Sequence, residues 1–120
     1  MSNTPNFDLA SFYTDLDKHL YQAQLDLEHL IEAYGEAGMQ HAKAYAEYRK
    51  AKAEACLRIR EDGKPVGMVT DLANGATADV KQAEMEAEAR VKKARLLVDA
   101  VTERINMLKY IGRTSETAGA

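Results

Sequence analysis

A seven-residue repeat runs through the stretch LASFYTDLDKHLYQAQLDLEHLIEAY, residues 9–34. Its apolar side chains fall in two rows, one of Leu9, Leu16, Ala23 and Leu30 and the other of Tyr13, Leu20, Leu27 and Tyr34. Alternating steps of three and four residues place both rows on one stripe of an α-helix, as in the seam of a coiled coil. The stretch therefore predicts a long amphipathic helix that packs against a second helix.

The overall composition also favours helix. The chain of 120 residues is 46% hydrophobic and 29% charged, with two prolines and no tryptophan. It holds no run of the roughly 20 apolar residues that a membrane-spanning helix needs. One cysteine cannot form an internal disulfide, and residues 1–12 lack the basic and apolar segments of a signal peptide. We therefore expect a cytoplasmic protein.

Two glycines interrupt the first helix without changing its register. The rows continue past Gly35 and Gly38 as Ala37, His41, Ala44, Tyr48, Ala51 and Ala55. Each glycine costs about 1 kcal/mol relative to alanine inside a helix. The sequence leaves open one long helix with a weak point, or two helices over about 7–34 and 37–62. A break or kink is favoured, because helices of about 50 residues are rare in small domains.

A corner follows the second helical stretch. Gly63 suits the left-handed position after a helix, and Pro65 prevents the helix from resuming. Residues 63–76 then form a connection in which Thr70 or Asp71 starts a single helical turn. Four apolar residues predict that this connection packs against the helices: Val66, Met68, Val69 and Leu72.

A last helix is predicted over 78–111, with Thr77 as its cap, Gly112 as its end and 113–120 as a short flexible tail. One row of its repeat holds Val91, Val98 and Ile105, with Glu84 at the solvent end. The other row holds Ala87, Ala94, Val101 and Leu108.

Together these segments predict one all-α domain over residues 1–112. Its architecture is an antiparallel hairpin of long helices with a third helical segment, as a three-helix bundle or a coiled coil. Many inward positions are alanine, which permits close approach but buries little area at about 25 cal/mol per Å². A lone alanine-lined hairpin would be marginal, so the first helix folds back, or two chains share their seams, or both. We expect self-association through the heptad stripes.

The charges are unevenly distributed along the chain. Residues 42–66 hold seven Lys or Arg against four Asp or Glu. If the connection at 63–76 reverses the chain, two basic groups come together as one belt: Arg49, Lys50, Lys52, Arg90, Lys92, Lys93 and Arg95. Tyr45 and Tyr48 lie one turn away, where they would stack on unpaired bases. Such a belt is predicted to bind DNA or RNA phosphates, although nearby glutamates would neutralise several of its charges.

Residues 1–41, in contrast, hold seven Asp or Glu against Lys18 alone. This acidic segment is either a solvated helix face or a surface for a basic partner. Its candidate partner-binding residues are Asp8, Asp15, Asp17, Asp26, Glu28 and Glu32.

The sequence contains no catalytic or metal-binding signature. The three histidines, at 19, 29 and 41, lie too far apart to chelate a metal from one helix, which would need a spacing of four. Cys56 has no histidine near it in the sequence and is interpreted as a small buried hydrophobe. We therefore predict no enzyme activity, no metal and no cofactor.

The most distinctive motif combines a helix with Gly63-Lys64-Pro65-Val66 and a following Asp-Leu-x-x-Gly, within YAEYRKAKAEACLRIREDGKPVGMVTDLANG, residues 45–75. With the helix that ends in Leu108-Lys109-Tyr110, it resembles small helical proteins of bacteriophages and prophages over residues 40–111. Such proteins are often encoded beside single-strand annealing, recombination or replication genes. The resemblance implies phage DNA metabolism inside a bacterial cell and transfers no catalytic residues.

Two functions follow as expectations. The first is a non-enzymatic accessory factor in phage DNA recombination or replication, which contacts single-stranded DNA, a DNA-processing protein, or both. The alternative is an inhibitor of a host defence or replication factor, which would present the carboxylates of the acidic first helix where nucleic acid normally binds. Neither function requires a small-molecule substrate or a membrane.

Overall fold

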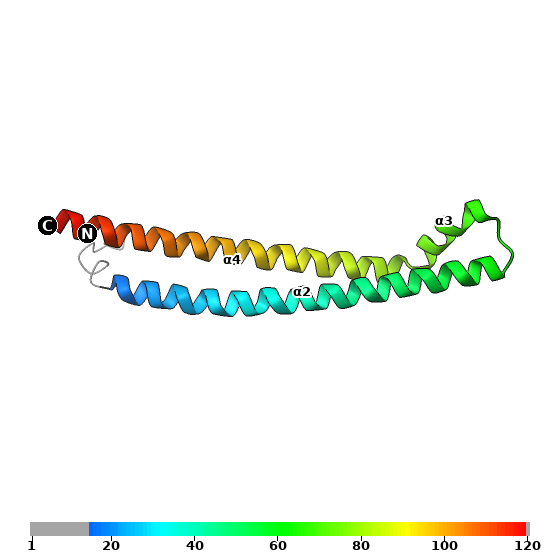
Figure 1. Cartoon of the computed structure of the whole chain (residues 1–120), viewed down its shortest axis with the longest axis horizontal. Coiled ribbons are helices and arrows are strands. Elements are labelled where there is room, and N and C mark those ends of the chain that lie inside the picture. Colours follow the sequence, from blue (N-terminus) through cyan, green and yellow to red (C-terminus); the bar gives the residue numbers. More distant parts are fainter. Residues whose placement is uncertain (1–14, 120) are drawn as a thin grey trace, which may run out of the picture. The chain divides into compact units, whose positions relative to one another are not determined.

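The computed structural model describes residues 15–119, which are almost entirely α-helical (Figure 1). Helix α2 covers Leu16–Glu61, α3 covers Val66–Ala76 and α4 covers Ala78–Gly119. The predicted all-α class and the third helical segment are confirmed. Among the helices of residues 15–119, none is both long enough and apolar enough to traverse a lipid bilayer.

The chain divides into two compact units, and each is described by itself. The terminal unit combines α2 up to Ile31 with α4 from Leu96 onward, and the turn unit spans Glu32–Arg95. Within each unit, α2 and α4 lie side by side and run in opposite directions (Figure 1). The predicted antiparallel pairing of the long helices is therefore confirmed.

Helix α2 continues through both of its glycines. Gly35 and Gly38 are helical, and a Cβ atom added to either would meet no atom within 4 Å. The predicted division into helices over 7–34 and 37–62 is therefore wrong, and the part of that prediction before residue 15 lies outside the described residues. Packing of the heptad face outweighs the local propensity cost of the two glycines, because tertiary contacts supply most of the stability of helices in proteins.

The end of α2 has the predicted geometry. Gly63 adopts a φ of +76°, the left-handed conformation that glycine tolerates. Its N–H donates to the carbonyl of Arg60 at 3.0 Å, and the N–H of Lys64 donates to the carbonyl of Ile59 at 3.4 Å. These two hydrogen bonds form a Schellman motif, which satisfies carbonyls that the helix end leaves open.

Helix α3 is an eleven-residue helix, longer than the single turn that the sequence predicted. Its buried side chains are Val69 and Ala73, so the predicted packing of the connection holds for Val69. The prediction is wrong for three apolar side chains that remain exposed: Val66, Met68 and Leu72. The helix runs back beside the final turns of α2 (Figure 1), and α4 consequently begins farther from the end of α2.

Thr77 is the one residue between α3 and α4. Its buried hydroxyl donates to the carbonyl of Ala73 at 2.7 Å, and its own carbonyl accepts from the N–H of Lys81 at 3.0 Å. Thr77 therefore occupies the predicted cap position before α4, while its hydroxyl binds the end of α3. This short junction fixes where α4 starts against α2.

The terminal unit is held together by the predicted rows. Ala23, Ile105 and Leu108 form a buried cluster, and four partly buried side chains pack against it: Leu16, Leu20, Leu27 and Val101. The fully buried alanine lets the two helices come close while longer neighbours fill the space beside it.

Helix α4 runs past Gly112, so the predicted helix end there is wrong. The first residues of the predicted tail over 113–120, residues 113–119, are helical, and residue 120 lies outside the described residues. Gly112 is part of the packed face of the terminal unit. A Cβ atom at this position would lie 2.9 Å from Cδ2 of Leu16. This glycine permits a close approach of α2 and does not mark a helix end.

Candidate nucleic-acid interface

Tyr48 lies at the centre of a basic and aromatic surface in the turn unit. The ammonium of Lys81, on α4, lies 4.7 Å from the centroid of its ring, and that of Lys52, on α2, lies 5.9 Å away. The guanidinium of Arg49 lies 5.8 Å from the ring centroid of Tyr45. Cations over aromatic faces are attracted by the ring quadrupole. We call these five residues the basic–aromatic surface.

Two hollows adjoin Tyr48, and both are lined by Tyr48 and Lys52. The larger, of about 410 Å³, lies where α2 meets the α3–α4 junction, and Asn74, Thr77 and Lys81 are among its lining residues. The smaller, of about 390 Å³, lies along α2 and also includes Tyr45, Arg49 and Cys56. The surface therefore offers recessed aromatic and cationic groups together.

A buried carboxylate holds Lys81 in place. Glu84 is only 5% exposed, and its Oε2 atom accepts from the ammonium of Lys81 at 3.2 Å. Its Oε1 atom accepts from Nε2 of His41, on α2, at 3.0 Å. Every buried side-chain nitrogen and oxygen among residues 15–114 has a hydrogen-bond partner. Both oxygens of this carboxylate thus accept a hydrogen bond. A carboxylate that is fully hydrogen-bonded can be buried at a low cost in free energy.

Hydrogen bonds, first from His41 and then from Lys81, lower the pKa of Glu84 below its ordinary value, while burial opposes this change. The bond to Glu84 raises the pKa of Lys81. Glu84 therefore stays ionised and Lys81 stays protonated near neutral pH, so the positive charge beside Tyr48 is maintained.

The predicted location of Glu84 at the solvent end of its row is wrong, because its side chain is buried. Its position in the heptad was right, but the seam continues past it and His41 faces it from the row on α2. Both residues are polar interruptions of otherwise apolar rows. Because each of the two polar residues interrupts an apolar row, the sequence could have indicated that they pair with each other.

His41, Glu84 and Glu88 place three possible metal-ligand atoms within 4.8 Å of one another. Spacing along a single helix did not reveal this cluster, because its members come from α2 and α4. The ammonium of Lys81 already binds the Glu84 carboxylate. A cation of the protein itself therefore neutralises the buried charge, and we assign the cluster to positioning Lys81.

The structure separates the predicted basic belt into two groups. Because His41 faces Glu84 and Lys81 lies over Tyr48, the part of α2 that holds Arg49, Lys50 and Lys52 lies opposite the start of α4 and not opposite the segment 90–95. Residues 90–95 lie opposite a different part of α2, about 20 Å along that helix from the basic residues at 49–52, at a rise of 1.5 Å per residue. The predicted adjacency is wrong, because α3 covers the end of α2 and shifts the start of α4.

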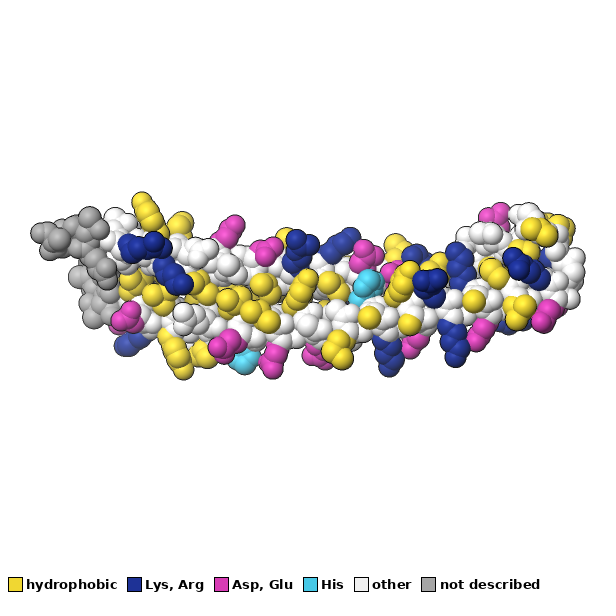
Figure 2. All heavy atoms as spheres, in the orientation of Figure 1, with side chains coloured by type: hydrophobic (Ala, Val, Ile, Leu, Met, Phe, Trp, Pro, Cys, Tyr) yellow, Lys and Arg dark blue, Asp and Glu magenta, His cyan; other side chains and the backbone are white. Residues whose placement is uncertain are grey.

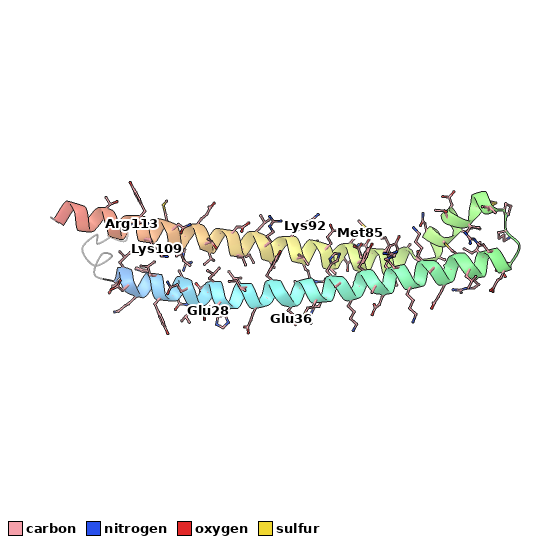
Figure 3. The ribbon with its side chains drawn as sticks, in the orientation of Figure 1. Glu28, Glu36, Met85, Lys92, Lys109 and Arg113 are labelled. Atoms are coloured by element: carbon pink, nitrogen blue, oxygen red, sulfur yellow. The ribbon has the colours of Figure 1, made fainter. Side chains whose placement is uncertain are left out.

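The second basic group lies on α4 in the same unit: Arg90, Lys92, Lys93 and Arg95. Lys92 projects from the side of α4 away from α2 and forms an ion pair with Glu88 at 3.4 Å (Figure 3). Arg90, Lys93 and Arg95 are exposed. Lys and Arg side chains project from both long helices of the turn unit, α2 and α4, with acidic side chains between them (Figure 2).

The predicted acidic residues are not equivalent. Asp26 is bound within the terminal unit, where it accepts from Arg104 at 3.2 Å and from Gln22 at 3.0 Å. Asp15 forms an ion pair with Lys18 at 3.5 Å. Exposed carboxylates remain at Asp17, Glu28 and Glu32, with Glu28 pointing away from α4 (Figure 3). Asp8 lies outside the described residues.

Comparisons of this chain with protein-family models, with curated proteins and with solved structures found no match.

Proposed function

We propose that this protein is a non-enzymatic accessory factor of DNA recombination or replication in a phage-infected bacterium. It contacts single-stranded DNA through the basic–aromatic surface. The phage context rests on the sequence resemblance over residues 40–111. The observation that carries the DNA contact is the convergence of Lys52 from α2 and Lys81 from α4 on Tyr48.

The chemistry of this surface suits a single strand. Arg49 and Lys52 offer charges to phosphates, and each phosphate that they neutralise releases counterions. The partly exposed ring of Tyr45 offers a face for a base, and base stacking of this kind tolerates any sequence. The hollows beside Tyr48 give unpaired bases room that a duplex would not need. We therefore expect salt-sensitive binding with little sequence preference.

The second basic group extends the same contact along α4. Its exposed residues lie within the turn unit, and we propose that a strand running along α4 from the basic–aromatic surface reaches them. Lys92 contributes less than its neighbours, because Glu88 already partners it.

The test is fluorescence anisotropy with a labelled single-stranded oligonucleotide over a series of salt concentrations. We expect binding at low salt, and a loss of affinity on the order of tenfold or more in Arg49→Glu/Lys52→Glu. The matched control is Lys18→Glu/Lys109→Glu, which reverses two lysines of the terminal unit and should bind as the wild type does. Absence of binding at low salt, or equal losses in both variants, contradicts the proposal.

The inhibitor function is the second candidate, and the exposed acidic side chains of α2 favour it. The terminal unit offers Asp17 and Glu28 to a basic partner, whereas Asp26 is engaged by Arg104. One stoichiometric host protein, captured in the presence of nuclease and lost in Asp17→Lys/Glu28→Lys, would support this function in place of the first.

A further inference from the structure

The outer face of α4 in the terminal unit carries a second apolar stripe. Leu96, Met107 and Tyr110 are 68%, 63% and 65% exposed, and Leu97 and Ala100 are exposed beside them. A hollow of about 570 Å³ lies on this face, lined by Ala100, Glu103, Arg104, Asn106, Met107 and Tyr110. Positions 96, 100, 103, 107 and 110 follow the same steps of four and three as the buried seam. The outer face is thus patterned as a helix-packing surface.

The sequence predicted self-association through the heptad rows, but those rows are occupied inside the chain. Ala23, Ile105 and Leu108 are buried between α2 and α4 of one molecule. A second copy would therefore need another surface. The outer stripe supplies one that leaves the seam intact.

We propose that the outer stripe of α4 binds a second copy of this chain, with the two α4 helices antiparallel about a two-fold axis between Glu103 and Arg104. A two-fold contact must be self-complementary. Around this axis Ala100 and Met107 exchange places, so a small side chain meets a large one. Leu97 and Tyr110 exchange places in the same way, which puts apolar groups opposite each other at both ends.

The charges at the centre also match under this symmetry. Glu103 of each copy comes within reach of Arg104 of the other, so two ion pairs of opposite direction flank the axis. Arg104 already donates to Asp26 of its own chain, with half of its side chain exposed. A guanidinium has five N–H donors, so Arg104 can bind Asp26 of its own chain and Glu103 of the second copy together. An acid and a base in adjacent positions at the middle of an apolar stripe thus favour a second copy over an unrelated partner.

Disulfide trapping tests the geometry directly. In a Cys56→Ser background, Glu103→Cys lies at the proposed axis and should link to itself under mild oxidation. Leu96→Cys, on the same stripe, should not, because its two copies would lie about 20 Å apart along the helices and a disulfide needs Cα atoms within about 7 Å. Linkage of both variants to the same extent, of neither, or of Leu96→Cys alone overturns the proposal.

Charge variants test the centre of the interface. Glu103→Arg places two positive groups at the axis, and Arg104→Glu places two negative groups there. Each variant alone should dimerise at least about tenfold more weakly than the wild type, and an equimolar mixture of the two should recover the dimer. Sedimentation equilibrium measures the dimerisation of each variant and of their mixture. The control is Met39→Glu, at an exposed position of the turn unit, which should stay dimeric. Circular dichroism verifies that each variant is folded. A monomeric wild type, or a mixture no tighter than its components, refutes the pairing.

Discussion

His41 and Glu84 meet across α2 and α4 with a distance of 3.0 Å between Nε2 and Oε1. Along the seam, the neighbouring positions are alanine or valine: Ala37, Ala44, Val80 and Ala87. If α4 slid by one heptad against α2, Glu84 would face Tyr34 or Tyr48 and lose its bond to His41. A single polar pair in an apolar seam fixes the register of the helices, as buried polar residues do in coiled coils. We infer that the pair selects the observed alignment.

Replacing Glu84 tests this role. Glu84→Gln should lower the melting temperature, because an amide has one acceptor oxygen where His41 and Lys81 need two. The double variant His41→Leu/Glu84→Leu should melt above Glu84→Gln, since removing both partners leaves no buried polar group unsatisfied. Thermal unfolding followed by circular dichroism compares the three proteins. A Glu84→Gln variant that melts with the wild type would show that the pair contributes nothing to stability.

The same carboxylate predicts an acid dependence of stability. The folded protein lowers the pKa of Glu84, so the folded state binds fewer protons than the unfolded chain in this range. Its contribution is fully present above the ordinary pKa of 4.5 and is lost as the pH falls through the lower folded value. In urea unfolding, the free energy of unfolding of the wild type should fall as the pH is lowered from neutral to acidic. The fall should be smaller for Glu84→Gln. Parallel profiles for the two proteins would contradict the assignment.

The two glycines in the middle of α2 predict an easy gain in stability. Each of Gly35→Ala and Gly38→Ala should raise the free energy of unfolding by about 0.5–1 kcal/mol, because alanine restricts the unfolded chain and each added Cβ meets open space. Urea unfolding measures the change. Gly112→Ala is the matched comparison and should gain less, because its Cβ would lie 2.9 Å from Cδ2 of Leu16. An equal gain at all three positions would show that Leu16 moves aside without cost.

The glycine at the corner should behave in the opposite way. Gly63→Ala keeps the space around the residue but forces an L-residue into a φ of +76°. We expect a loss of about 1 kcal/mol in the free energy of unfolding, as is usual for alanine in the left-handed region. Gly67→Ala, inside α3 and with equal open space, is the control and should not lose stability. A neutral Gly63→Ala would mean that the corner changes its conformation.

The heptad pattern predicted which side of each long helix faces inward, and the buried residues confirm it at Ala23, Ile105 and Leu108. It did not predict which residue of α2 meets which residue of α4. A repeat of seven fits equally well after a shift by seven, so the alignment depends on other features. Here those features are α3, which occupies the space beside the end of α2, and the pair of His41 and Glu84. The predicted belt failed because it required this alignment.

The glycines show why local signals gave mixed results. At Gly63 two other features also indicate the end of a helix, because a proline follows and no apolar row continues. The predicted helix end at this glycine is correct. At Gly35, Gly38 and Gly112 the apolar rows or their packing extend across the glycine, and the helix continues. A helix boundary is thus better predicted from the end of the apolar pattern than from a glycine alone. The basic–aromatic surface was found in part, because Tyr45, Tyr48, Arg49 and Lys52 share one helix, whereas Lys81 joins them only through the fold.

The close match of the two long helices has an evolutionary consequence. Because α2 and α4 share one repeat, seven residues inserted into each helix on the side of His41 and Glu84 away from the corner would add a layer without disturbing that contact. A lineage could in this way lengthen or shorten the paired helices in steps of about 10 Å, while the corner and the surface around Tyr48 keep their geometry. Insertions into one helix alone would instead break the match, so we expect length variants among descendants to be paired.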